Sequence, residues 1–86
     1  MATQWPPWWD WQLELSPHVL KRMLDRGFSE VDLRLMMEQA TAIREDREPG
    51  RWVVDTSHHS QPWKVIVEPD LADEVLVVVT AYWVQS

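Results

Sequence analysis

The apolar run at residues 75–79 constrains the fold of this chain more than any other feature. Its five residues, Val-Leu-Val-Val-Val, place apolar side chains on both faces of a strand. Both faces of such a strand have to be covered, so we expect it inside a sheet. We predict a strand over 74–84, with two faces given by the alternation of side chains. One face would carry Leu76, Val78, Thr80, Tyr82 and Val84, and the other Val75, Val77, Val79, Ala81 and Trp83.

The remaining elements follow from local signals. Residues 11–15 alternate as a short strand does, and Ser16, Pro17 and Gly27 mark the cap, first residue and end of a helix over 17–26. Ser29 and Asp32 form an acidic capping box for a helix over 30–40. Strands are predicted over 42–47, 51–57 and 63–68.

Short turns join these last strands, which therefore pair antiparallel. We predict an α+β domain of order β-α-α-β-β-β-β, in which two helices pack on one face of a curved antiparallel sheet of three to four strands. Each helix has an apolar face at helical spacing. The first comprises Val19, Leu20, Met23 and Leu24, and the second comprises Leu33, Met36, Met37 and Ala40, broadened by Val31 and Leu35.

The 86 residues predict one domain, residues 11–86, preceded by an arm over 1–10 that is rich in Trp and Pro. The arm holds three of the seven tryptophans. Two interpretations are open. The arm packs Trp against the core, or it exposes an aromatic patch to a partner.

Composition narrows the classes of function. The chain has no Cys, no run long enough to span a membrane and no signal-peptide pattern, so we expect a cytoplasmic protein without membrane contact. A net charge of −6 opposes a uniformly basic nucleic-acid surface. A local basic patch can still exist within this net charge, because the acidic residues concentrate at 45–48 and 68–74. The basic residues that fall close together are Lys21, Arg22, Arg26 and Arg34.

His18, Arg22 and Arg26 are spaced four residues apart, so they form one row on the first helix. An imidazole and two guanidiniums can hold an anion and transfer a proton. The alternative is an ordinary helix surface, with the arginines paired to Asp25, Glu14 or Glu30.

Two stretches resemble a known bacterial family. They are Ser16-x-His18-x-x-x-Arg22-Met23-x-x-Arg26-Gly27-Phe28-Ser29 and the closing Val-Val-Val-Thr80-Ala-Tyr82, with a Gly50-Arg51 turn between them. The chain is similar over about residues 13–83 to an uncharacterised family grouped with RelE-like and BrnT-like toxins, of the barnase–EndoU–colicin–RelE ribonuclease fold.

That resemblance implies a toxin-like, metal-independent endoribonuclease that uses neither metal nor cofactor. It points to His18, Arg22 and Arg26 on the helix and to Lys64, Thr80 and Tyr82 on the sheet as catalytic residues. His18 would transfer a proton, the arginines and Lys64 would bind phosphate, and Tyr82 would donate a hydrogen bond or stack on a base. RNA would be the substrate, and an antitoxin-like protein a partner.

Two other hypotheses remain open. The acidic balance and surplus of Trp favour a non-catalytic interaction module, whose partner is an antitoxin-like protein or a second copy of the chain. Asp55, His58 and His59 are metal-ligand types within five residues, but adjacent side chains of a strand point to opposite faces. A polar hairpin loop accounts for them more simply.

Overall fold

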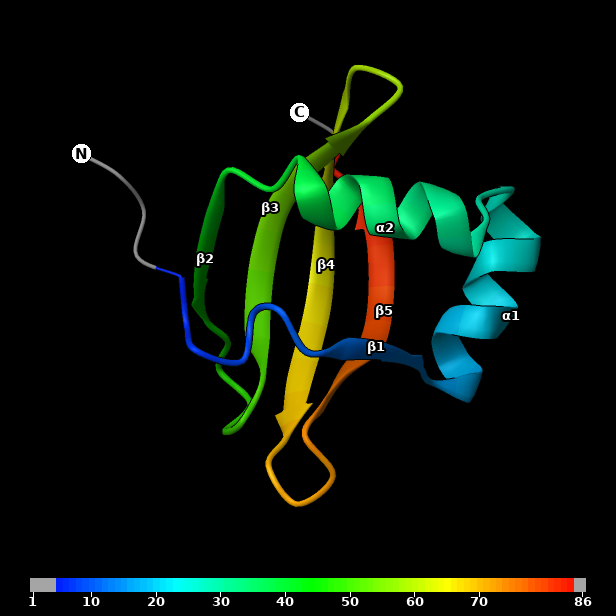
Figure 1. Ribbon diagram of the computed structural model, residues 1–86. Coiled ribbons are helices and arrows are strands. Elements are labelled where there is room, and N and C mark those ends of the chain that lie inside the picture. Colours follow the sequence, from blue (N-terminus) through cyan, green and yellow to red (C-terminus); the bar gives the residue numbers. More distant parts are fainter. Residues whose placement is uncertain (1–4, 85–86) are drawn as a thin grey trace.

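The computed structural model describes residues 5–84, which form two helices and a five-stranded sheet (Figure 1). In chain order the elements are β1 (Gln12–Leu15), α1 (Pro17–Arg26), α2 (Glu30–Glu38), β2 (Ala42–Glu45), β3 (Trp52–His58), β4 (Gln61–Asp70) and β5 (Val75–Trp83). The α+β class and the predicted order of elements are confirmed. None of the helices in the described part of the chain is long and apolar enough to cross a membrane.

The sheet is mixed, with strand order β1-β5-β4-β3-β2. Strands β2 to β5 pair antiparallel, as the short turns predict, whereas β1 pairs parallel to β5. The predicted count of three to four strands is therefore too low, because the N-terminal strand joins the same sheet. β1 covers residues 75–78 of β5 on one side and β4 covers them on the other. The apolar run thus lies inside the sheet.

A β-bulge in β5 corrects the predicted division of its faces. Val67 pairs with Val78 but Ile66 pairs with Thr80, so Val79 is an extra residue in β5. An extra residue reverses the alternation beyond it. Ala81 is consequently fully buried with Leu76 and Val78, whereas Thr80 and Tyr82 lie opposite Ile66 and Lys64 on the other face.

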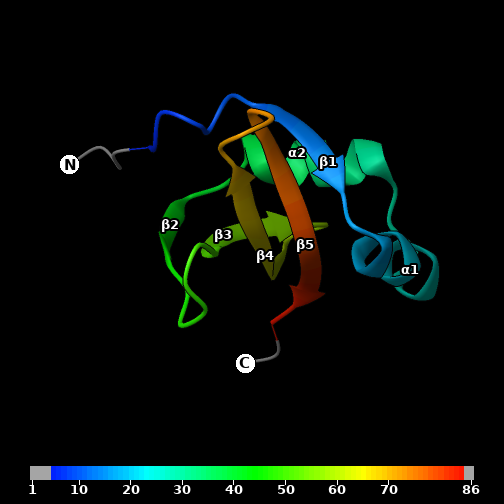
Figure 2. The same cartoon turned by 90° about the horizontal axis from the view of Figure 1, so that it is seen from below.

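Local capping fixes both helices as the sequence predicts. Ser16 caps α1 by accepting from the Val19 N–H at 3.1 Å, and Gly27 ends it with a positive φ of 69°. Ser29 and Asp32 form the capping box of α2. α2 lies across one face of the sheet and is tied to β3 by a hydrogen bond from the Thr56 hydroxyl to the Met36 carbonyl (Figures 1 and 2). α1 lies beside β5, beyond β1.

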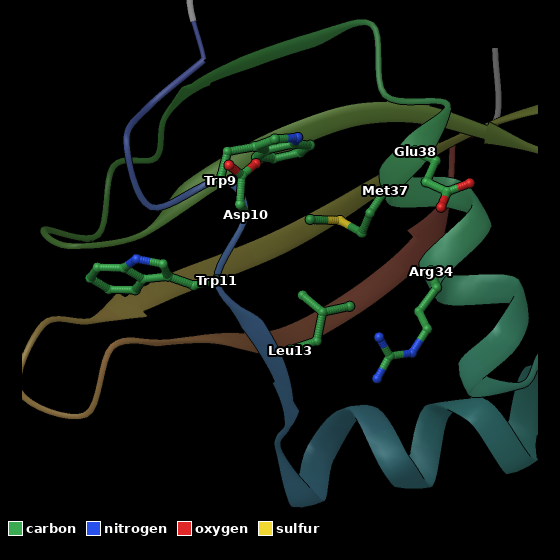
Figure 3. Close-up of a pocket in the computed structure, with 7 residues that line it drawn as sticks. All are labelled: Trp9, Asp10, Trp11, Leu13, Arg34, Met37 and Glu38. Atoms are coloured by element: carbon green, nitrogen blue, oxygen red, sulfur yellow. The ribbon is translucent and has the colours of Figure 1, made fainter.

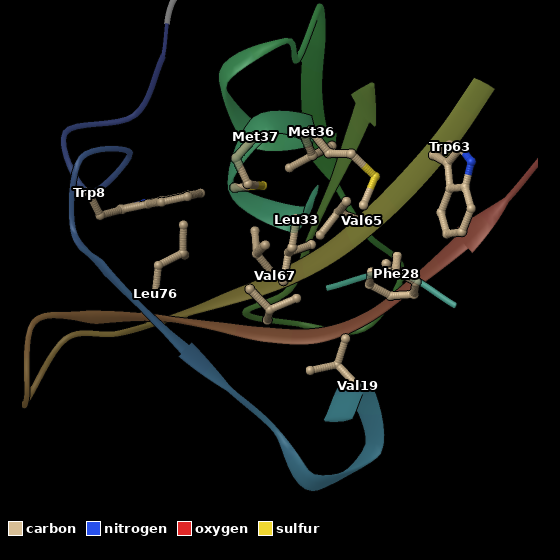
Figure 4. Close-up of a cluster of buried hydrophobic side chains, with 13 residues drawn as sticks. Trp8, Val19, Phe28, Leu33, Met36, Met37, Trp63, Val65, Val67 and Leu76 are labelled. Atoms are coloured by element: carbon tan, nitrogen blue, oxygen red, sulfur yellow. The ribbon is translucent and has the colours of Figure 1, made fainter. Parts of the chain in front are cut away.

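The core fills the space between α2 and the sheet (Figure 4). Met36 and Leu33 of α2 are fully buried there against Val65 and Val67 of β4. The predicted apolar faces are too broad, however. Leu20 and Leu24 of α1 and Val31 and Leu35 of α2 are exposed, since each lies to the side of its helix that turns away from the core.

The N-terminal arm contributes to this core from Trp8 onward. Trp8 is 8% exposed, and its ring meets that of Trp52 edge-on with centroids 5.4 Å apart. Trp5 is 36% exposed and lies against Trp9. The first interpretation of the arm is therefore confirmed for Trp8, while residues 1–4 lie outside the described part of the chain.

We expect Trp8→Ala to lower the free energy of unfolding by about 3 kcal/mol, because it removes a large buried ring from the core. Trp5→Ala is the matched control, with an expected loss below about 1 kcal/mol from its exposed ring contact. Urea denaturation followed by circular dichroism measures both. Equal losses for the two variants would contradict the placement of Trp8 in the core.

Candidate functional site

The three predicted residues of α1 have different surroundings. His18 is exposed in the first turn, ~12 Å along the helix axis from Arg26. Arg22 forms an exposed ion pair with Asp25 at 3.5 Å, which confirms that part of the helix-surface interpretation. Arg26 instead reaches the sheet, where its guanidinium donates to the Ala81 carbonyl at 2.5 Å.

Arg26 makes this contact because β1 is shorter than β5. β1 pairs with residues 75–78, so β5 has a free edge from Val79 onward. The Ser16 hydroxyl donates to the Val79 carbonyl at 2.8 Å, and Arg26 donates to the Ala81 carbonyl, two residues further on. Side chains from the two ends of α1 thus satisfy backbone groups that a neighbouring strand would otherwise pair. A guanidinium has five N–H donors, so Arg26 keeps others available for a ligand.

The predicted sheet residues lie on the face away from α2. Lys64 is directly opposite Tyr82, and its ammonium lies 3.9 Å from the Asp55 carboxylate, which also binds Arg44. Thr80 pairs with Ile66 on the same face. Of the six predicted residues, Arg26 and Tyr82 line one pocket together, and the other four do not line that pocket.

Arg26 and Tyr82 meet in an open cleft at the end of the sheet where α1 terminates. Two adjoining pockets, of ≈ 410 Å³ and ≈ 390 Å³, share Arg26, Trp63 and Trp83. Tyr82 lines the first, and Gly27, His58, His59 and Gln61 line the second. We call this region the hairpin cleft, because the turn between β3 and β4 forms one of its walls.

The β3–β4 turn fixes the two imidazoles of the hairpin cleft. His58 pairs with Gln61, leaving His59 and Ser60 as a two-residue turn with positive φ values of 50° and 63°. Such turns match the twist of a hairpin. The left-handed His59 brings its ring to 4.0 Å from that of His58, so the expectation that the adjacent rings diverge is wrong. His58 also meets Trp63 edge-on at 5.5 Å.

Charge is divided between the two ends of the sheet. The β2–β3 and β4–β5 turns, which hold most of the acidic clusters at 45–48 and 68–74, lie at the end opposite the β3–β4 turn (Figure 1). Asp32, in the first turn of α2, is an acidic group on which the two imidazoles act. The Ser29 backbone N–H donates to its carboxylate at 2.9 Å and lowers the pKa of Asp32, and His58 and His59 lower it further.

The metal hypothesis for Asp55, His58 and His59 finds no support. Among residues 5–84, no three His, Asp or Glu side chains are grouped to hold a metal ion. The Asp55 side chain lies on the sheet face away from α2, bound to Arg44 and Lys64, whereas His58 contacts Trp63 on the face toward the helices. The segment is a hairpin turn, as the simpler interpretation predicts.

A further pocket, of ≈ 380 Å³, lies between the arm and α2 (Figure 3). Trp9, Asp10, Trp11, Leu13, Arg34, Met37 and Glu38 line it. Its Arg34 is already paired with Glu30 at 3.1 Å, and Figure 3 shows Trp11 pointing away from Arg34 and Glu38. It contains no imidazole, so it offers less chemistry than the hairpin cleft.

The fold and the cleft define a small α+β domain with basic and aromatic side chains at one end of a mixed sheet. Residues 15–83 match the family described as Domain of unknown function (DUF4258), and the chain belongs to that family. The match includes the whole hairpin cleft. No curated protein and no solved structure matches the chain.

His58, His59, Trp63 and Trp83 were not among the site residues predicted from the sequence. A usable signal was present in the His58-His59-Ser60-Gln61 segment between two strands, because a two-residue hairpin turn presents its side chains at a sheet end. The register that sets Trp63 opposite Trp83 depends on the bulge, and no local sequence pattern predicts that bulge.

We expect Arg26→Met to lower the free energy of unfolding by about 1 kcal/mol, because the Ala81 carbonyl loses its donor. Arg22→Met should change it by less than about 0.5 kcal/mol, since an exposed ion pair contributes little. Urea denaturation of the two variants beside the wild type tests this. A larger effect at Arg22 than at Arg26 would show that α1 is held differently.

Proposed function

We propose that the protein is a small, metal-independent endoribonuclease whose RNA substrate binds in the hairpin cleft. One observation carries this proposal: a guanidinium, two imidazoles and three aromatic rings line two adjoining open pockets. A guanidinium suits a phosphate, imidazoles exchange protons near neutral pH, and the two exposed rings, Tyr82 and Trp83, suit stacking on unpaired bases. The resemblance to RelE-like and BrnT-like toxins supports the same activity, with an antitoxin-like partner and a cytoplasmic substrate.

The reaction needs no redox step and no co-reactant. One imidazole of the His58–His59 pair takes the proton of the ribose 2′-hydroxyl while its oxygen bonds to phosphorus. The bond from phosphorus to the 5′-oxygen then breaks, and the second imidazole, in its protonated form, gives its proton to that oxygen. The products are a 2′,3′-cyclic phosphate and a free 5′-hydroxyl. Arg26 stabilises the added charge on the phosphoryl oxygens.

This assignment differs from the one that the family resemblance implies for His18. His18 lies ~12 Å along α1 from Arg26 and outside the hairpin cleft. Tyr82 (36% exposed) and Trp83 (49% exposed) stand at the cleft, where a base can reach them. Lys64 and Thr80 line neither pocket of the hairpin cleft, so we give them no part in bond breaking.

A non-catalytic interaction module is the second candidate. It is favoured by the exposure of four large apolar side chains on the helices: Leu20, Leu24, Val31 and Leu35. None of these four side chains lines the hairpin cleft. The two functions are therefore separable by substitution.

We expect the wild type to cleave a single-stranded RNA in excess chelator and to leave 2′,3′-cyclic phosphate ends. The double variant His58→Asn/His59→Asn should reduce the rate at least ~100-fold, because it removes both proton-transfer groups. Asn tolerates the left-handed backbone of residue 59, so the turn should persist. Mass spectrometry of the products and initial rates measure the result.

His18→Ala is the control, and it should retain the wild-type rate. Loss of cleavage in His18→Ala with an active hairpin variant would return the site to the α1 row. Absence of cleavage by the folded wild type would overturn the ribonuclease proposal and favour the interaction module.

A further inference from the structure

We propose that the protein forms a two-fold symmetric homodimer in which α1 of each copy packs against α2 of the other. The contact would be made by two helix stripes. The α1 stripe consists of Leu20, Lys21 and Leu24, and the α2 stripe consists of Val31, Leu35 and Glu38. The proposal does not depend on the ribonuclease activity.

Both stripes are apolar at helical spacing and turn away from the core. Leu20 and Leu24 are 47% and 86% exposed, and Val31 and Leu35 are 67% and 47% exposed. Each pair is four residues apart, so its side chains are neighbours on one helix surface. Half of the large hydrophobic side chains that are exposed over residues 5–84 belong to these stripes, the others being Trp5, Leu71, Tyr82 and Trp83. Paired exposed leucines mark an interaction surface more than scattered ones do.

The charges on the two helices are complementary. α1 carries Lys21, Arg22 and Arg26 against Asp25, a net charge of +2, whereas α2 carries Glu30, Asp32 and Glu38 against Arg34, a net charge of −2. Several of these groups are already engaged, in the Arg22–Asp25 and Arg34–Glu30 pairs and in the capping box. Among the described residues, Lys21 and Glu38 form no ion pair, and both are exposed.

These two unpaired charges lie in the stripes themselves. Lys21 is three residues before Leu24, and Glu38 is three residues after Leu35, so each charge adjoins the apolar pair of its helix. Two stripes of the same composition but opposite charge fit each other better than either fits itself. Because one copy carries both, a two-fold axis forms both contacts at once, with Lys21 of each copy beside Glu38 of the other. The occupant that the surface fits is therefore a second copy of this chain.

Sedimentation equilibrium over a wide concentration series tests the dimer. The wild type should reach twice the mass of the chain. Leu24→Ser should raise the dimer dissociation constant about 100-fold, because it removes two leucine side chains per dimer from the apolar contact. Leu71→Ser is the matched control: Leu71 is 72% exposed in the β4–β5 turn and should have no effect.

Charge exchange identifies the pairing of the helices. Lys21→Glu and Glu38→Lys should each raise the dissociation constant about tenfold, because like charges then face each other at two places. The double variant Lys21→Glu/Glu38→Lys should regain the wild-type dimer. Circular dichroism confirms that each variant is folded.

A monomeric wild type throughout the series would overturn the proposal and indicate a partner of another sequence. A dimer unaffected by Leu24→Ser would place the interface elsewhere. Failure of the double variant to regain the dimer would overturn the packing of α1 on α2. Every residue that lines the hairpin cleft comes from one chain, so a monomer can still cleave RNA and the two proposals fail separately.

Discussion

The backbone of β5 is the constraint around which the other elements are arranged. Along residues 75–78 it is paired on both sides, by β1 and β4. Beyond β1 its outward carbonyls need donors, and α1 supplies them from Ser16 at one end and Arg26 at the other. The position of α1 follows from these two bonds. The bond from Arg26 to the Ala81 carbonyl also holds Arg26 at the mouth of the hairpin cleft.

The sequence predicted the parts of the fold that depend on neighbouring residues. Ser16, Gly27 and the Ser29–Asp32 pair fix the helix ends through contacts within a few residues, and those ends were predicted well. The division of the faces of β5 was wrong beyond Val79, because a bulge depends on the partner strand. The exposure of Leu24 was missed for a related reason. An apolar stripe shows that a side chain avoids water, but not which surface covers it.

The candidate site, like the fold, has one part that the sequence predicts and another that depends on residues distant in the sequence. Arg26 and Tyr82 were predicted as site residues because they lie in the two stretches that resemble the family, and the fold brings them together. His58 and His59 were interpreted as loop residues, because their place in the site depends on a left-handed turn that brings their rings together, with His58 edge-on to Trp63. The effect of the acidic composition on the site also depends on where the acidic residues lie in the fold. The acidic clusters at 45–48 and 68–74 outnumber the arginines beside them, Arg47 and Arg51, and lie at the other end of the sheet, so a net charge of −6 is compatible with an anion at the hairpin cleft.

The hairpin cleft and the helix stripes are linked through the stability of α1. Val19 is the fully buried residue of this ten-residue helix, which makes α1 the less firmly packed of the two helices. Isolated helices of this length are marginal in water, so α1 depends on its bonds to β5 and on whatever covers Leu20 and Leu24. A second copy packed on those leucines would hold α1 against the sheet and so keep Arg26 in place. Dimerisation would then order the phosphate-binding side of the cleft without contributing any residue to it.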